Sequence, residues 1–81
     1  MKILKFYTET CAPCKVISKI LDKIEGVEIE SINALEDIVA VDKYCICTTP
    51  TLIFLDGDKE VARMHGLVSE QDIRDTLKKC K

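Results

Sequence analysis

The sequence has no tryptophan, only three glycines and two prolines, and no repeat, low-complexity stretch or Gly/Ser linker that would divide it. It also lacks an apolar run near the roughly 20 residues that cross a bilayer. Its first residues contain neither the apolar stretch nor the small-residue cleavage site of a signal peptide. We therefore expect a single domain over residues 1–81, with no membrane segment and a location in the cytoplasm.

Charge of one sign is not in excess, because 12 basic and 14 acidic residues give a net charge of −2. Neutralising nucleic-acid phosphates requires a basic face, so we expect no nucleic-acid partner. An apolar fraction of 47% beside 32% charged residues is typical of a folded soluble protein. We expect the protein to be a monomer. A chain of this length buries only about 60–65% of its unfolded surface, so its core has little margin.

Cysteine, in contrast, is abundant, with five in 81 residues. In a small secreted protein such a number indicates a disulfide framework. Here the number of cysteines is odd and the sequence shows no export signal, and both observations argue against such a framework. In a reducing compartment, cysteines more often carry out chemistry or bind a metal.

The hydropathy pattern predicts an α/β fold with the order βαβαββα. Parallel strand pairs need helical crossovers, and right-handed crossovers place helices on both faces of a four-stranded mixed sheet. The second strand alternates exposed and buried residues and is expected at the sheet edge. The predicted strands cover 3–7, 27–31, 51–55 and 59–65, and the predicted helices lie in 11–24, 35–41 and 69–80.

Three features predict where helices begin and end. Gly26 stands where a left-handed residue would end the first helix. Asn33, followed three residues later by Glu36, resembles a capping arrangement for the second helix. Ser69 is predicted to cap the last helix, whose apolar stripe includes Cys80.

Cys11 and Cys14 form a Cys-x-x-Cys pair where the first helix begins after a strand. A helix N-terminus presents unpaired N–H groups and about half a positive charge, and both stabilise a thiolate. Cys11 can therefore ionise readily and attack a disulfide, and Cys14, one turn later, can resolve the mixed disulfide. Pro13 suits the first helical turn because the N–H it lacks would have no partner there.

The chain resembles the thioredoxin superfamily in several segments, in order and over nearly its whole length. Residues 10–15, Thr-Cys-Ala-Pro-Cys-Lys, are similar to the Trp-Cys-Gly-Pro-Cys-Lys active-site motif. Residues 44–52 resemble the stretch around the family's cis-proline, and 56–58 the hairpin between its last two strands. The N-terminal strand and helix of full-length thioredoxins are missing. The chain therefore looks like the minimal version seen in glutaredoxins and short archaeal or phage proteins.

This resemblance implies a thioredoxin-like fold and a protein-disulfide oxidoreductase that acts as a cytosolic reductant. It implies no cofactor beyond the Cys11–Cys14 disulfide, substrates that are disulfide-containing proteins, and a thioredoxin-reductase-like enzyme or glutathione as electron source. A cis bond between Thr49 and Pro50 is implied, with the Thr49 backbone pairing with an extended substrate. The residues of the active-site loop would be Thr10, Ala12, Pro13 and Lys15.

Some positions depart from the family's pattern. Thr10 replaces a tryptophan, which removes an apolar shelf for protein substrates, and Ala12 replaces a glycine. Lys5 occupies the place of a buried aspartate that relays a proton to the resolving cysteine. Lys5 could point inward and modulate Cys14, or it could extend from the strand end into water.

Cys45 and Cys47 precede Pro50 and are expected near the active-site end of the fold. Cys45 is predicted to be a small buried filler. Cys47 is a candidate for redox coupling to the active-site pair. In an alternative function, Cys11, Cys14, Cys45 and Cys47 together form a metal-binding module, since four cysteines are a common ligand set. No metal is expected in the preferred interpretation.

Overall fold

The computed structural model describes residues 1–79 and confirms the predicted fold. Three helices, α1 (Ala12–Leu21), α2 (Ile38–Tyr44) and α3 (Glu70–Lys79), alternate with four strands in the order βαβαββα. Strand β1 is Lys2–Tyr7, β2 is Glu28–Asn33, β3 is Thr51–Asp56 and β4 is Lys59–His65. Cys80 lies outside the described residues, so its predicted place on the last helix is not described.

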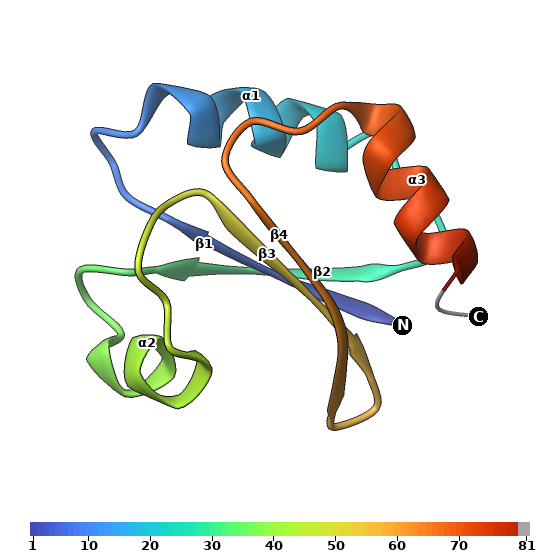
Figure 1. Cartoon of the computed structure of the whole chain (residues 1–81). Coiled ribbons are helices and arrows are strands. Elements are labelled where there is room, and N and C mark those ends of the chain that lie inside the picture. Colours follow the sequence, from blue (N-terminus) through green and yellow to red (C-terminus); the bar gives the residue numbers. More distant parts are fainter. Residues whose placement is uncertain (80–81) are drawn as a thin grey trace.

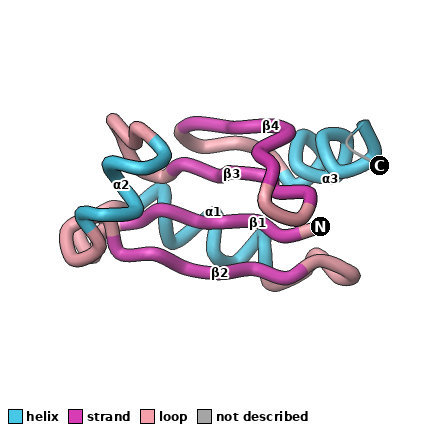
Figure 2. The backbone as a smooth tube through the Cα atoms, turned by 90° about the horizontal axis from the view of Figure 1, so that it is seen from below, coloured by secondary structure: helices cyan, strands magenta, loops and turns pink. Residues whose placement is uncertain are grey.

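The strands lie side by side in the order β2-β1-β3-β4 (Figure 2), so β2 is at an edge as predicted. Strand β1 pairs with β2 in parallel and with β3 antiparallel. Helices α1 and α3 cover one face of the sheet and α2 covers the other (Figure 1). None of the helices within residues 1–79 has the length and apolar character needed to cross a bilayer.

Each sheet face has its own apolar core, and alternate residues of β1 contribute to the two. Ile3 packs with residues of α1 and α3, whereas Leu4 and Phe6 pack on the α2 side. Phe6 is fully buried, and its ring meets that of Tyr44 edge to face at 6.0 Å between centroids. The aromatic contact between Tyr44 and Phe6 therefore packs helix α2 against the sheet close to the end of β1.

The predicted helix ends are correct in one case and wrong in two. Ser69 caps α3, since its hydroxyl accepts a hydrogen bond from the Asp72 N–H at 3.1 Å. Helix α1 ends at Leu21, short of Gly26. Asn33 does not cap α2: it accepts from the N–H of Leu35, two residues on, and Asp37 is the N-cap.

The end of α2 has an unusual backbone conformation. Cys45 follows the helix with φ = 53°, in the left-handed region, where glycine is the common residue. The N–H of Ile46 reaches back to the Val41 carbonyl at 2.9 Å, which fixes the direction in which the chain leaves the helix. From there the chain runs to Pro50 and enters β3.

Candidate active site

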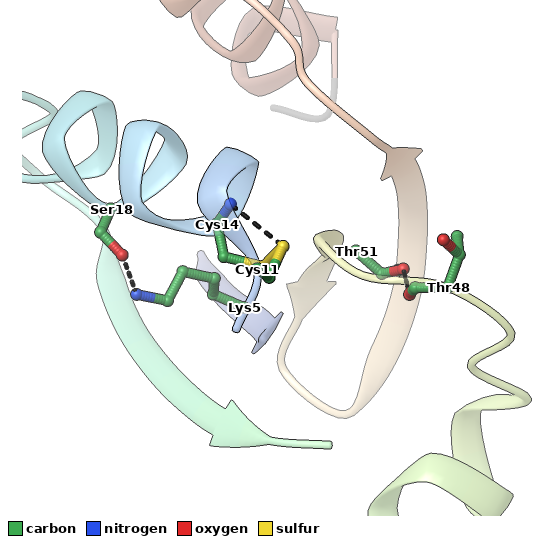
Figure 3. Close-up of a disulfide and its surroundings, with 6 residues drawn as sticks. All are labelled: Lys5, Cys11, Cys14, Ser18, Thr48 and Thr51. Carbon is green, nitrogen blue, oxygen red and sulfur yellow. Dashed lines mark hydrogen bonds between the residues drawn. A yellow bond between two sulfur atoms is a disulfide. The ribbon is translucent and has the colours of Figure 1, made fainter. Parts of the chain in front are cut away.

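Cys11 and Cys14 lie at the N-terminus of α1, just beyond the end of β1. A disulfide joins them, with the Cα atoms 5.3 Å apart (Figure 3). Cys11 is the N-cap of the helix, and Pro13 lies in the first turn of the helix. Proline has no backbone N–H, but an N–H in this turn would have no partner within the helix, so no hydrogen bond is lost. The Cys-x-x-Cys spacing thus places both sulfur atoms within one helical turn, as predicted.

The two sulfur atoms have different surroundings. Cys14 is only 3% exposed, whereas Cys11 is partly open to solvent. The Cys14 N–H donates a hydrogen bond to the Cys11 sulfur at 3.2 Å. No acidic residue stands in the first turn of α1 to oppose a negative charge there. When the disulfide is reduced, the N–H group and the helix dipole favour a thiolate at Cys11.

The segment before β3 borders the same end of the sheet. Thr51 pairs with Phe6 in β1, so the residues that precede Thr51 lie beside those that lead from β1 to Cys11 (Figure 3). The bond between Thr49 and Pro50 is cis, as the family resemblance implies. Pro50 is fully buried, and Thr49 is partly exposed.

Two hydrogen bonds hold this cis-proline segment in place. The Thr51 hydroxyl donates to the Thr48 carbonyl at 2.6 Å, and the Gly66 N–H donates to the Pro50 carbonyl at 2.9 Å. The segment is thereby tied to the end of β4 as well as to β3. The remaining residues predicted for the active-site loop are all exposed: Thr10, Ala12, Pro13 and Lys15.

Lys5 takes the inward of its two possible orientations. It is 9% exposed on the α1 face of the sheet, and its Nζ donates to the Ser18 hydroxyl at 2.5 Å (Figure 3). Ser18 follows Cys14 by one helical turn, so the two side chains are neighbours on α1. The ammonium group of Lys5 is therefore held beside the turn of helix that carries Cys14.

Burial lowers the pKa of Lys5 from its usual value of 10.5, and the nearby Asp22 carboxylate partly opposes this effect. The pKa in the folded protein is thus below that of the unfolded chain. The charged side chain therefore costs stability at neutral pH, and the cost falls as the pH rises toward 10.5.

Cys45 and Cys47 are free and exposed, so the prediction that Cys45 is a buried filler is wrong. Within residues 1–79, no three Cys, His, Asp or Glu side chains lie close enough to hold a metal ion. Cys11 and Cys14 are bonded to each other, and the structure does not assemble the four-cysteine metal site. A cavity of about 620 Å³, lined in part by Met1, Gly26 and Leu77, lies at the other end of β1.

Comparison with known proteins agrees with this geometry. Residues 1–79 match the thioredoxin family. A thioredoxin of Chlamydia pneumoniae is 30% identical, over 95% of this chain and 79% of its own length. One of Chlamydia caviae is 29% identical, over 88% of this chain and 74% of its own.

Solved structures give the same result. Fasciola hepatica thioredoxin superposes with a TM-score of 0.87 at 27% identity, over 99% of this chain and 80% of that one. Thioredoxin 1 of Thermosipho africanus gives 0.82 at 27% identity, over 99% and 93%. A mutant thioredoxin from Halobacterium salinarum gives 0.91, over 96% and 72%, but at 20% identity it supports the fold alone.

Proposed function

The chain belongs to the thioredoxin family of thiol–disulfide oxidoreductases, and we propose that it reduces disulfides in other proteins with Cys11 as the attacking thiol and Cys14 as the resolving thiol. The difference between the two sulfur atoms supports these roles. Cys11 is partly exposed and accepts an N–H hydrogen bond, whereas Cys14 is 3% exposed behind it. An incoming disulfide can reach Cys11 but not Cys14.

The reaction proceeds in two exchanges. The Cys11 thiolate attacks one sulfur of the substrate disulfide, a mixed disulfide forms, and the other substrate sulfur leaves as a thiolate. Cys14 then loses its proton and attacks the Cys11 sulfur, which releases the second substrate thiolate. Two electrons have passed to the substrate, and the product is the Cys11–Cys14 disulfide that the structure contains.

Thr49 and Pro50 are proposed to bind the substrate segment next to its disulfide. Thr49 is partly exposed beside the active-site loop, and its backbone can pair with an extended chain. The hydrogen bonds of Thr51 and Gly66 keep this segment in one conformation, so little ordering is required when the substrate arrives.

A reductase or glutathione must return electrons to the oxidised pair. The family implies protein-disulfide substrates and a reductase, and we propose a thioredoxin-reductase-like enzyme, with glutathione as the alternative. A reducing compartment such as the cytoplasm would suit this cycle, because the dithiol is the working form.

Titration of the protein in buffers of defined redox potential tests this function. Free thiols are trapped at each potential, and each cysteine is followed by mass spectrometry. Cys11 and Cys14 are expected to oxidise together, with a midpoint near the thioredoxin value of about −270 mV. A midpoint above about −200 mV would contradict the reductant role, and failure of the two to pair would contradict the mechanism.

Lys5 is proposed to tune this couple through Cys14. A positive charge beside Cys14 favours its thiolate and so stabilises the dithiol state. The Lys5→Met variant, which keeps an unbranched apolar stem, is expected to have a midpoint about 10–30 mV more negative, and 30 mV corresponds to about 1.4 kcal/mol.

The same titration of Ser18→Ala provides the control for Lys5. That variant loses the hydroxyl that binds Nζ but keeps the ammonium group, so its midpoint should move less than that of Lys5→Met. Equal midpoints for the Lys5→Met variant and the unmodified protein would show that Lys5 only fills space.

A further inference from the structure

Cys45 and Cys47 lie in the segment between α2 and β3. Both are exposed, whereas Ile46 between them packs into the apolar core on the α2 face of the sheet. The alternation places Ile46 inward and both thiols outward. The Ile46 N–H is bonded to the Val41 carbonyl, so this orientation is held by the backbone and by the core together.

A second observation places the Cys47 thiol beside the backbone of residue 45. The Cys47 thiol donates to the carbonyl oxygen of Cys45 at 3.7 Å, so the Cys47 side chain folds back over residue 45, while the Cys45 thiol donates to the Asp42 carbonyl oxygen at 3.8 Å. Arg63, whose partner in β3 is Ile53, lies on the same face of the sheet as α2.

The pKa of Arg63 is raised, first because of its hydrogen bond with Glu60 and to a smaller extent through electrostatic interaction with Cys45 and Cys47. The guanidinium group of Arg63 is thus a cation that acts on both cysteines. The positive charge of Arg63 is partly offset by the Glu60 carboxylate, which accepts two hydrogen bonds from the guanidinium group at 2.9 and 3.0 Å.

The backbone at Cys45 gives a third indication. Its φ of 53° suits glycine, and a residue with a side chain is strained in that conformation. Strained positions that a sequence fills with a reactive side chain are often functional sites. Here the residue in the left-handed turn is an exposed cysteine, two residues before Cys47.

From this arrangement we propose that Cys45 and Cys47 are a second redox-active dithiol, a site that small anionic disulfides such as oxidised glutathione convert to a Cys45–Cys47 disulfide. Either thiol loses its proton to solvent and attacks the small disulfide. One thiolate of the small molecule leaves, and a mixed disulfide remains on the protein. The second cysteine then loses its proton and displaces the other thiolate, so two protein thiols are oxidised and one small disulfide is reduced to two thiols.

The span between the two residues allows this bond. Two consecutive Cα–Cα steps of about 3.8 Å keep residues two apart within roughly 7.6 Å, and disulfides occur at Cα separations of about 4.4–6.8 Å. The carbonyl contact of Cys47 already brings its sulfur over residue 45. The bond then requires the Cys45 side chain to rotate from the Asp42 carbonyl toward Cys47.

Equilibration of the full chain with increasing ratios of oxidised to reduced glutathione tests the proposal. Samples are quenched in acid, alkylated and digested with trypsin. The peptide that begins at Tyr44 carries both cysteines and no Lys or Arg before Lys59, whereas Cys80 follows Lys79 and falls in another peptide. An internal disulfide is recognised by the loss of two hydrogens and by resistance to alkylation, and a mixed disulfide by the added mass of glutathione.

We expect the internal disulfide to accumulate as the buffer becomes more oxidising, both in the natural sequence and in a Cys11→Ser/Cys14→Ser variant. Cys47→Ser and Cys45→Gly should stop at the glutathione adduct, at a level about tenfold or more above that in the natural sequence, since intramolecular displacement is fast. Cys45→Gly suits the left-handed backbone, so loss of the internal disulfide there would not reflect misfolding.

Two results with the natural sequence would overturn the proposal. One is a peptide that remains alkylated or carries only glutathione adducts at the most oxidising ratio. The other is a disulfide that links this peptide to that of Cys80. Loss of the reaction only in the Cys11→Ser/Cys14→Ser variant would also overturn direct oxidation, because the Cys11–Cys14 disulfide would then be the oxidant.

Discussion

The Cys11→Ser variant is expected to lose its disulfide reductase activity by about three orders of magnitude or more. A serine hydroxyl at this position ionises far less readily than a thiol and cannot form a mixed disulfide, so the first exchange has no nucleophile. The measurement is the release of thiols from a disulfide-linked protein, with dithiothreitol supplying electrons. Far-ultraviolet circular dichroism would verify that the variant is folded.

Cys14→Ser provides the matched comparison. It keeps Cys11 and its position at the helix N-terminus but removes the resolving thiol, so the reaction should stop after the first exchange. The expected product is a covalent adduct of the variant with its protein substrate, visible on a non-reducing gel and cleaved by dithiothreitol. An adduct formed through Cys14 in the Cys11→Ser variant would reverse the proposed roles.

Truncation of Phe6 to alanine is expected to lower the free energy of unfolding by about 3–5 kcal/mol. Phe6 is fully buried and supports Tyr44 at the end of α2, so the change leaves a cavity between the sheet and that helix. Proteins of this size have a total stability of about 4–12 kcal/mol, estimated from about 0.05–0.15 kcal/mol per residue. The loss is therefore a large share of the total, and urea unfolding at 25 °C measures it.

The Phe6→Leu variant is the control for this effect. Leucine retains most of the apolar volume, so its cost should be closer to 1.5 kcal/mol. Equal losses in the two variants would show that the edge-to-face contact with Tyr44, rather than the filled volume, carries the stability. A small loss in Phe6→Ala would mean that α2 closes over the cavity.

The sequence was sufficient for the element order and the redox pair because both rest on local patterns. Strand alternation and helical periodicity are set by which side chains leave water. A Cys-x-x-Cys pair at the start of a helix has a stabilised thiolate in any protein with that local structure. The Ser69–Asp72 cap is equally local, since each side chain bonds a backbone group three residues away.

The second helix shows where local patterns are insufficient. Asn33 and Glu36 have the spacing of a cap, yet Asn33 forms a turn with Leu35 and the helix begins after Asp37. Several residues can cap the same stretch, and the choice depends on where β2 ends and on how α2 reaches Phe6. Ile38 and Val39 are exposed, so helical apolar spacing did not identify the buried face.

Lys5 and Cys45 could not be placed from the sequence for a related reason. Alternation predicts the face on which Lys5 lies but not whether its long side chain curls inward to Ser18 or extends to water. Cys45 was expected in the core because free cysteines are often buried. Its exposure follows from the left-handed turn after α2. Glycine or asparagine at position 45 would have predicted such a turn, but the residue there is a cysteine.

The charges along β2 have a consequence for association between copies of the chain. An edge strand offers unpaired N–H and C=O groups to any other strand, and proteins often protect such edges with charge. Glu28 and Glu30 are exposed on this edge, and Glu30 lies 3.7 Å from Lys2 of the neighbouring strand. A second copy aligned along β2 would bring its own carboxylates against these, so the sheet disfavours its extension at this edge even at high protein concentration.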